Sequence, residues 1–264
     1  MSSLQSIRLK NPGSLPDRYP FSLPLIRDMG EIEFPAAVTF FVGENGSGKS
    51  TLLEGIAAAV NATCAGSELI DTDPSLEYAR QMAAQLRLSR NGSGMRGFYF
   101  RAEDFFGFTK RVIRDQEELG ELEEQFSKEL TGYGRMLATG MARGQRAALE
   151  DSYGEDPDAK SHGESFLEFF EQRIVPGGLY LMDEPETPLS PLRILTLISM
   201  MKEMVTQDCQ FIIATHSPIL MAFPDAKILN FDSVPVSEIS YDNVEHVSLT
   251  RSFLNKPEAF LRRL

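Results

Sequence analysis

The sequence predicts an α/β fold with a mostly parallel sheet flanked by helices, and three observations support this prediction. An apolar run at residues 37–42 (AVTFFV) leads into the glycine-rich segment Gly43–Ser50 (GENGSGKS), and a helical pattern follows at once. Strand and helix patterns then alternate from residue 164 to residue 231, as expected when each parallel strand needs a crossover. Hydrophobic residues make up 42% of the 264 residues, which is enough to bury a substantial core.

The first half of the chain combines β-prone and helical segments. Prolines and short β-prone runs before residue 43 predict an antiparallel β part at the N-terminus. Further along, the patterns predict a helix over 50–60, a helix over 76–88, a short strand over 98–100 and an acidic helix over 109–130. The glutamates of the last helix are typical of a solvated helix face rather than of a ligand site.

The second half begins with a segment at 131–162 that is rich in Gly, Asp and Arg and that we expect to be mobile. The later patterns predict, in order, helix 164–173, strand 179–183, helix 190–206, strand 210–214, helix 217–222 and strand 226–231. No heptad array is long enough for an extended coiled coil. We therefore expect one domain over 1–264, with a compact helical lobe inserted at 61–175.

Composition and charge narrow the classes of function. The net charge of −12 and a pI near 4.8 argue against indiscriminate binding to nucleic acid, because such binding depends on neutralising phosphates. The two cysteines, Cys64 and Cys209, lie far apart and predict neither a disulfide scaffold nor a zinc site. The N-terminus lacks the apolar core of a secretory signal, and the apolar stretch at 194–201 is too short for a membrane span. We therefore expect a cytoplasmic protein with no intrinsic membrane segment.

The glycine-rich segment matches the pattern G-x-x-x-x-G-K-[ST] between a predicted strand and a predicted helix, and this context favours a phosphate-binding loop over a chance glycine turn. Glycines let successive backbone N–H groups converge on phosphate oxygens, and the helix N-terminus adds partial positive charge. Lys49 would neutralise the β- and γ-phosphates, and the Ser50 hydroxyl would ligate Mg²⁺. The predicted nucleotide-binding residues are Gly43, Asn45, Gly46, Ser47, Gly48, Lys49, Ser50 and Thr51.

Two further strand ends carry side chains suited to hydrolysis. The run 179–184 (LYLMDE) places Asp183 where it can hold the magnesium shell, and Glu184 where it can act as general base towards water. Adjacent acids are also common in surface turns, so the glycine-rich loop decides between the two readings. The run 211–218 (FIIATHSP) ends at His216, which is either a structural histidine or a sensor of the γ-phosphate; its position at a strand end favours the sensor.

Over residues 38–231, this ordered set resembles the ATP-binding-cassette (ABC) type ATPases of the P-loop NTPase superfamily. The resemblance rests on a Walker A loop at Gly43–Ser50, a signature-like Ser161–Glu164 (SHGE), a Walker B Asp183–Glu184 and a switch histidine, His216. The signature departs from the family, which usually has glycine where His162 stands. The segment from Glu184 to Pro191 resembles stand-alone predicted ATPases, the SMC group and the ATPase halves of overcoming-lysogenisation-defect-like nucleases.

The resemblance implies a composite site. Ser161 and the Gly163 backbone would contact the γ-phosphate of an ATP held mainly by another subunit, so ATP would join two copies in a head-to-tail homodimer. Ser190 stands near the usual place of a cross-dimer aspartate. Glu103 is the nearest candidate for a further contact to the metal, with a plain surface acid as the alternative. For stacking on adenine, Tyr19 and Phe21 are candidates by position, and core packing is the alternative for both.

These observations leave three functions to compare. The leading hypothesis is a soluble ABC-type ATPase whose Mg²⁺-dependent ATP hydrolysis and dimerisation drive an unidentified effector protein or a nucleic-acid process. The alternative is the nucleotide-binding subunit of an ABC membrane transporter, against which stand the loop around Ser190 and the unusual signature. A metabolite kinase would use the same glycine-rich loop but would explain neither Glu184 nor His216.

Overall fold

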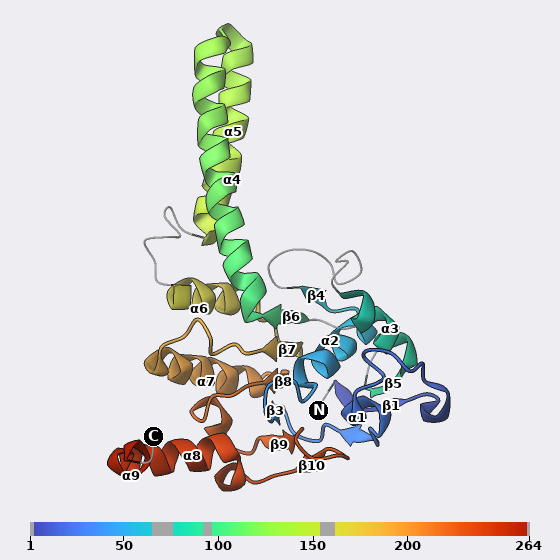
Figure 1. The fold of residues 1–264 in the computed structure, drawn as a ribbon. Helices are drawn as coiled ribbons and strands as arrows, with labels where there is room; N and C mark the ends of the chain where they lie inside the picture. The colour runs from blue at the N-terminus through green and yellow to red at the C-terminus, as the bar shows by residue number, and fades with distance from the viewer. Residues whose placement is uncertain (1–2, 65–75, 92–96, 154–161, 263–264) are drawn as a thin grey trace. The chain divides into compact units, whose positions relative to one another are not determined.

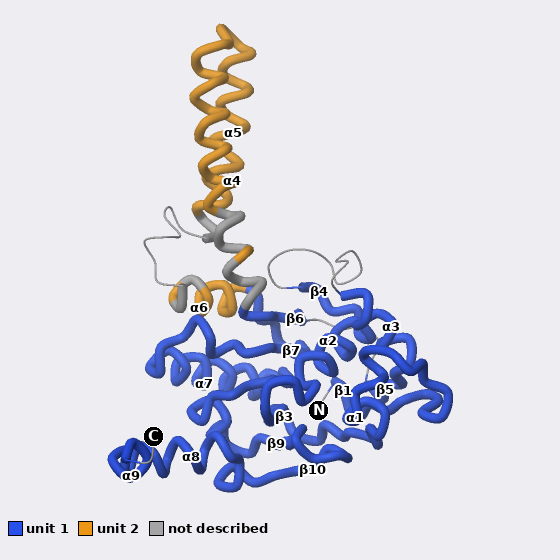
Figure 2. The backbone as a smooth tube through the Cα atoms, in the orientation of Figure 1, with its two compact units in different colours: residues 1–102, 173–264 blue, residues 103–172 orange. Residues whose placement is uncertain are grey.

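The computed structural model describes residues 3–64, 76–91, 97–153 and 162–262 (Figure 1). The chain divides into two compact units, the first made of residues 1–102 and 173–264 and the second of residues 103–172 (Figure 2). The first unit holds both sheets and the glycine-rich loop, and the second is helical. The mixed α/β architecture confirms the predicted fold class.

A seven-stranded sheet forms the centre of the first unit, in the order β10-β9-β3-β8-β7-β6-β4. All its pairings are parallel except β10 with β9. The central strands are nearly all apolar because both faces of a parallel sheet are covered, and every residue of β3 and β8 is buried. The strands are β3 (Val38–Val42), β4 (Thr63–Cys64), β6 (Gly97–Arg101), β7 (Leu179–Asp183), β8 (Gln210–Ala214), β9 (Lys227–Asn230) and β10 (Ser237–Glu238).

A three-stranded antiparallel sheet accounts for the predicted N-terminal β part. It consists of β1 (Leu4–Leu9), β2 (Ile32–Glu33) and β5 (Leu86–Arg90), in the order β2-β1-β5. The predicted helix over 76–88 was therefore wrong at its end. Helix α3 (Glu77–Gln85) stops where the alternating residues of β5 pair with β1. Antiparallel pairing overrides the helical pattern there because it buries the side chains of Leu86 and part of Leu88.

Helix α2 (Lys49–Ala59) is the best-buried helix next to the main sheet. Its apolar side chains pack against α3 and against β7 and β8, so it confirms the helix predicted after the glycine-rich loop. The predicted helix at 217–222 is a single 3₁₀ turn, η3 (Leu220–Ala222). The other helical elements of this unit are η1 (Pro12–Ser14), α1 (Pro24–Arg27), α7 (Pro191–Val205), η4 (Tyr241–Asn243), α8 (Glu245–Asn255) and α9 (Pro257–Leu261).

The second unit contains two long antiparallel helices, α4 (Ala102–Glu129) and α5 (Gly132–Tyr153), and α6 (His162–Arg173). The two long helices form a hairpin, and Glu123 of α4 pairs with Arg143 at 2.6 Å and with Arg146 at 3.5 Å. Within the segment at 131–162 that we expected to be mobile, residues 132–153 form helix α5, and residues 154–161 lie outside the described part of the chain. Good helix formers between the glycines, together with a partner helix, offset a cost of about 1 kcal/mol per glycine.

The expected organisation, a single domain with a lobe at 61–175, stays a prediction. The second unit spans 103–172, while β4 and β6 of the remaining range belong to the seven-stranded sheet. Within the described residues, none of the helices has both the length and the apolar character needed to cross a membrane.

Candidate nucleotide site

The candidate site lies where three neighbouring strands of the seven-stranded sheet end. Strand β8 lies between β3 and β7, and its residue Ala214 pairs in register with Phe41 on one side and Asp183 on the other. The chain leaves β3 into the glycine-rich loop, β7 into Glu184 and β8 into Thr215. Parallel α/β proteins bind ligands at this edge of the sheet.

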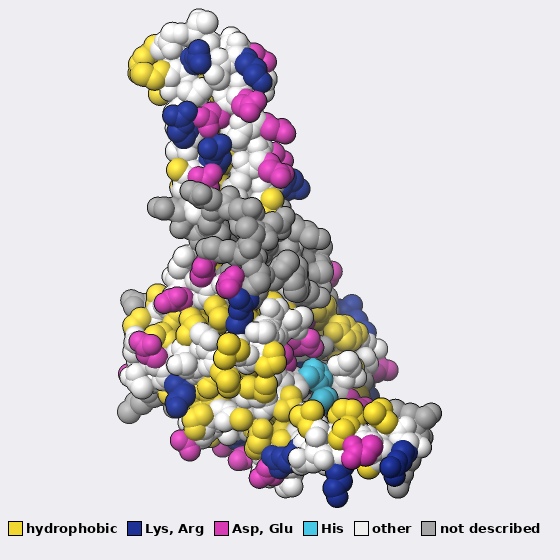
Figure 3. All heavy atoms as spheres, turned by 90° about the vertical axis from the view of Figure 1, so that its left-hand side faces the viewer, with side chains coloured by type: hydrophobic (Ala, Val, Ile, Leu, Met, Phe, Trp, Pro, Cys, Tyr) yellow, Lys and Arg dark blue, Asp and Glu magenta, His cyan; other side chains and the backbone are white. Residues whose placement is uncertain are grey.

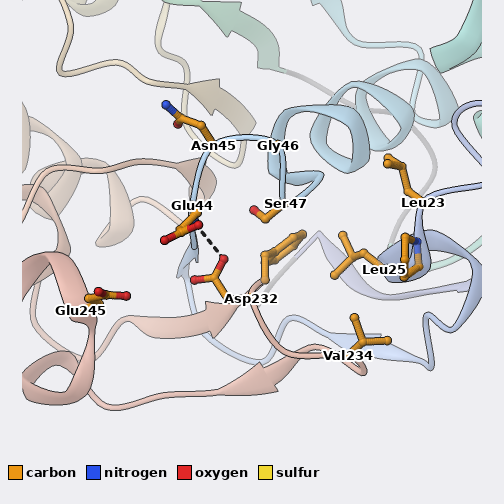
Figure 4. Close-up of a pocket in the computed structure, with 11 residues that line it drawn as sticks. Leu23, Leu25, Glu44, Asn45, Gly46, Ser47, Asp232, Val234 and Glu245 are labelled. Carbon is orange, nitrogen blue, oxygen red and sulfur yellow. Dashed lines mark hydrogen bonds between the residues drawn. The ribbon is translucent and has the colours of Figure 1, made fainter.

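The start of the loop is held by Asp232, which follows β9. The main-chain N–H of Glu44 donates to Asp232 Oδ1 at 2.7 Å (Figure 4). Gly43 has φ = +144°, and a Cβ at this position would lie 2.8 Å from the same oxygen, so a larger residue would displace the carboxylate. The loop also borders a cavity of about 460 Å³, whose other wall includes Leu25 and Val234 (Figure 4).

Lys49 folds back into the loop. Its Nζ donates to the carbonyl oxygens of Gly43 at 2.7 Å and Glu44 at 2.8 Å. Burial lowers the pKa of Lys49, whereas the carboxylates of Asp232, Asp183 and Glu184 raise it. These carboxylates favour the charged ammonium group, which is the form that attracts a phosphate.

The N-terminus of α2 is suited to an anion. The first helical hydrogen bond runs from Leu52 N–H to Gly48 O at 2.9 Å, so the N–H groups of Lys49, Ser50 and Thr51 have no acceptor within the helix. No side chain caps this end of the helix. Main-chain donors, a helix dipole and an ammonium group in one place fit the phosphates of a nucleotide.

The predicted metal ligands Ser50 and Asp183 lie together. Ser50 Oγ donates to Asp183 Oδ1 at 3.1 Å. A hydroxyl and one carboxylate fit Mg²⁺, which usually takes one or two carboxylates and completes its shell with phosphate oxygens and water. Among the described residues, no group of three or more His, Cys, Asp or Glu side chains forms a metal cage. The third predicted ligand, Glu103, belongs to α4, and its side chain lies outside the described part of the chain.

Glu184 and His216 lie beside each other in the lining of a cavity next to the loop. Glu184 Oε1 lies 3.9 Å from His216 Nε2, and the cavity of about 530 Å³ is lined by Glu44, Asn45, Glu184, His216 and His246. Glu184 has φ = +49°, an unusual conformation for a residue with a side chain, and its N–H donates to Ala214 O at 2.9 Å. Backbone strain of this kind is concentrated at functional sites.

Glu186 contributes a contact that sequence reasoning missed. Its Oε1 accepts hydrogen bonds from Thr215 Oγ1 at 2.6 Å, from His216 N at 2.8 Å and from Ser217 N at 3.1 Å. Burial raises the pKa of Glu186, and these hydrogen bonds oppose that shift. The segment after β7 is thereby joined to the segment after β8. Only the tertiary pairing reveals this role, since an acid two residues after Glu184 has no diagnostic spacing.

His246, in the first turn of α8, is the second missed residue. Its Nε2 lies 3.2 Å from His216 Nδ1, and the two rings meet edge to face with their centroids 4.8 Å apart. Burial lowers the pKa of His216, and Lys49 and His246 lower it further, whereas Glu184 and Asp232 raise it. The net effect is a lowered pKa, which favours the neutral form of His216.

The neutral His216 predicts a loss of stability in mild acid. Above the ordinary pKa of 6.5, the side chain is neutral in both the folded and the unfolded chain. As the pH falls below 6.5 towards the lowered folded pKa, the unfolded chain binds a proton first, so the free energy of unfolding decreases. Urea unfolding followed from about pH 8 to pH 5 should show this decrease, and His216→Gln should make it shallower. Equal slopes for both proteins would contradict the prediction.

The remaining predicted site residues are the two candidates for adenine stacking and the two signature-like residues. Phe21 is only 2% exposed and packs in the core, so it cannot stack on a base. Tyr19 is 48% exposed, and its hydroxyl lies 2.9 Å from Thr51 Oγ1, which keeps it a candidate. Gly163 belongs to α6 of the second unit, and Ser161 lies outside the described residues. The role of these two signature-like residues stays a prediction.

Comparisons with known proteins give two family matches. A model described as "AAA domain" matches residues 6–132, and one described as "AAA domain, putative AbiEii toxin, Type IV TA system" matches residues 167–222. The first match includes the glycine-rich loop, and the second includes Asp183, Glu184 and His216. No curated protein matches the chain.

Several solved structures are similar to the chain at low identity. An SMC head domain with an extended coiled coil, bound to the C-terminal domain of ScpA and derived from Pyrococcus furiosus, is 14% identical, with 98% of this chain and 100% of that chain covered and a TM-score of 0.46. The SMC head domain from Thermotoga maritima is 18% identical, with 90% and 98% covered and a TM-score of 0.40. The cbiO1 protein from Clostridium perfringens, part of the ABC transporter complex cbiONQ, is 14% identical, with 89% and 90% covered and a TM-score of 0.42.

The family matches fall on the two segments of the chain that the fold joins at one edge of the sheet. The loop, the neighbouring carboxylates and the histidine have the order and the proximity that the sequence predicts. Both segments that carry the candidate site residues are thus similar to AAA-domain family models.

Proposed function

We propose that the protein binds ATP with Mg²⁺ and hydrolyses it to ADP and phosphate. The observation that carries the proposal is the contact of Ser50 with Asp183 at one sheet edge, with Glu184 and His216 both lining the adjacent cavity. Lys49 and the amides at the start of α2 would hold the phosphates, because they place positive charge and unpaired donors together. Bound Mg²⁺ would neutralise developing negative charge on the phosphate oxygens.

Glu184 is the proposed general base. A water oxygen forms a bond to the γ-phosphorus while the bond from phosphorus to the bridging oxygen of ADP breaks, and Glu184 takes the proton that the water loses. The Glu184 side chain is 47% exposed, so it is open to solvent in the single chain. His216, beside Glu184 in the cavity lining, would contact the γ-phosphate and fix its position.

ATP-dependent head-to-tail dimerisation is the second part of the proposal. A second copy would cover the exposed side of the cavity and would bring Ser161 and Gly163 to the γ-phosphate, as the family resemblance implies. Apolar side chains gather on the face of the first unit that carries α7 and α8, next to histidine side chains (Figure 3), and Leu192 and Leu254 are 74% and 72% exposed. A contiguous exposed apolar surface is typical of an interaction site, which supports a covering subunit.

The hairpin of helices α4 and α5 favours a partner other than the membrane subunits of a transporter. Helix α4 has 28 residues and α5 has 22, which corresponds to about 42 Å and 33 Å of helix at 1.5 Å per residue. A pair of long antiparallel helices between the Walker A loop and the signature resembles the arm-like insert of chromosome-type clamps more than the compact lobe that the sequence suggested. We therefore favour an effector protein or a nucleic acid as the load over a transporter subunit.

The choice of load can be tested by DNA binding. If nucleic acid is the load, the ATP-bound protein should bind labelled single-stranded or duplex DNA at low salt, and the affinity should fall steeply as salt increases, because Lys and Arg contacts to phosphates displace counterions. Fluorescence anisotropy with ATP-Mg²⁺, compared with the nucleotide-free protein, gives the measurement. If neither the ATP-bound nor the nucleotide-free protein binds DNA at low salt, nucleic acid is excluded as the partner, and an effector protein is left as the proposal.

The hydrolysis itself is tested by phosphate release from ATP with Mg²⁺ present and after chelation. Release should depend on the metal, because the proposed site holds the phosphates through a metal ion that Ser50 and Asp183 ligate. Release by the purified protein that persists unchanged after chelation would contradict the metal assignment.

A further inference from the structure

The imidazole of His216 has two different neighbours, one at each ring nitrogen. Nδ1 lies 3.2 Å from His246 Nε2, whereas Nε2 lies 3.9 Å from a carboxylate oxygen of Glu184. The Nε2 atom is buried and has no hydrogen-bond partner among the described residues. Its hydrogen-bonding capacity is therefore unused, on a side chain that lines the cavity.

These neighbours decide which nitrogen carries the proton. A neutral imidazole has one N–H donor and one acceptor nitrogen. An ionised carboxylate only accepts, so a proton on Nε2 of His216 faces Glu184 favourably, whereas a lone pair there would be repelled. Nδ1 must then accept a hydrogen bond, and His246 Nε2 is the atom in place to donate it. The two N–H donors then run in series, from His246 to His216 and from His216 towards Glu184.

We propose that His246 is a positioning residue that holds His216 in the tautomer with its proton on Nε2, so that His216 presents an N–H donor to the γ-phosphate. The inference deepens the proposed ATPase function and rests on it. The opposite tautomer would present a lone pair to a negatively charged phosphate, which would weaken the contact that the reaction needs.

The surroundings of His246 hold it in place. It lies in the first turn of α8, between Val244 and Val247, which are each 2% exposed. The Tyr241 hydroxyl donates to the carbonyl oxygen of Pro218 at 3.0 Å, two residues beyond His216. The turn η4, which leads into α8, is thus joined to the segment after β8 through a second contact, which limits how far the two rings can separate.

Nitrogen-15 NMR of histidine-labelled protein tests the tautomer without nucleotide. The sequence contains three histidines, so His162→Gln and His246→Gln assign the signals by elimination. At about pH 7.5, where His216 is neutral because its pKa lies below 6.5, we expect an acceptor-type shift for Nδ1 and a protonated-type shift for Nε2. A protonated Nδ1 in the wild-type protein would overturn the proposal.

Two variants of His246 separate positioning from simple packing. His246→Gln keeps an N–H donor at the end of the side chain, and His246→Leu fills the space without one. We expect His246→Leu to lose the single tautomer of His216 and to lower kcat for ATP about 10-fold with little change in KM, as for other groups that orient a functional histidine. His246→Gln should keep the tautomer and most of kcat.

Equal kcat values for His246→Leu and the wild type would overturn the proposal, as would an unchanged His216 tautomer in His246→Leu. Circular dichroism and thermal unfolding establish that both variants fold. If the wild-type protein shows no ATP hydrolysis, the proposed function fails, whereas the tautomer is still decided by the NMR spectra of the nucleotide-free protein. The two failures are therefore distinguishable.

Discussion

Lys49→Ala should reduce ATP affinity by about 100-fold or more, because the phosphates lose their only ammonium partner in the glycine-rich loop. The substitution also leaves the carbonyl oxygens of Gly43 and Glu44 without the donor that now lies 2.7 Å and 2.8 Å away. Isothermal titration calorimetry with ATP-Mg²⁺ measures the affinity, and phosphate release measures the turnover. Both should fall to background.

Lys128→Ala is a matched control for this prediction. Lys128 is exposed on α4 and forms a surface ion pair with Glu124 at 3.1 Å, so its loss should change neither ATP binding nor turnover. Thermal unfolding of Lys49→Ala shows whether the loop variant is folded at the assay temperature. A folded Lys49→Ala protein that hydrolyses ATP at the wild-type rate would contradict the proposal that Lys49 binds the nucleotide phosphates.

Glu184→Gln should keep ATP binding, reduce hydrolysis by about 10²- to 10⁴-fold and accumulate a dimer in the presence of ATP-Mg²⁺. The amide has nearly the shape of the carboxylate but cannot accept the proton of the attacking water. Because hydrolysis no longer removes the γ-phosphate, the ATP-bound state should persist. Phosphate release gives the rate, and light scattering coupled to size exclusion gives the mass.

Glu258→Gln serves as the control, since Glu258 is an exposed acid in the first turn of α9 and should change neither the rate nor the mass. The two parts of the prediction can fail separately. Wild-type turnover by Glu184→Gln would exclude Glu184 as the general base. A monomer at saturating ATP-Mg²⁺ would contradict the composite site while leaving ATP binding intact.

The sequence predicted the strands of the parallel sheet well, because strands buried on both faces are continuous apolar runs. Strands β3, β7 and β8 match the predicted runs to within a residue. The sequence prediction failed where tertiary contacts determine the secondary structure. Strand β5 forms because it pairs with β1. Helix α5 was missed because its glycines suggested a loop, although its arginines contact Glu123 of the partner helix. Ser50 and Asp183 lie close together because the strands that precede them end at the same edge of the sheet. The apolar runs before the two motifs already predicted this edge.

The roles of Glu186 and His246 could not be predicted from the sequence, for a physical reason. Their roles depend on contacts to His216, which is 30 residues away from each of them along the chain. No local period or motif spacing encodes such a pairing. The tautomer of His216 likewise depends on groups from three separate segments, and only their relative positions in the folded chain define it.

The hydrogen bonds of Glu186 limit how the site can move. One carboxylate oxygen holds Thr215 and two successive amides, while Glu186 itself belongs to the same turn as Glu184. Glu184, the proposed general base, and His216 therefore cannot separate without breaking three hydrogen bonds to one carboxylate oxygen of Glu186. Any opening of the cleft between turnovers should shift these two groups as a single block relative to the loop that carries Lys49.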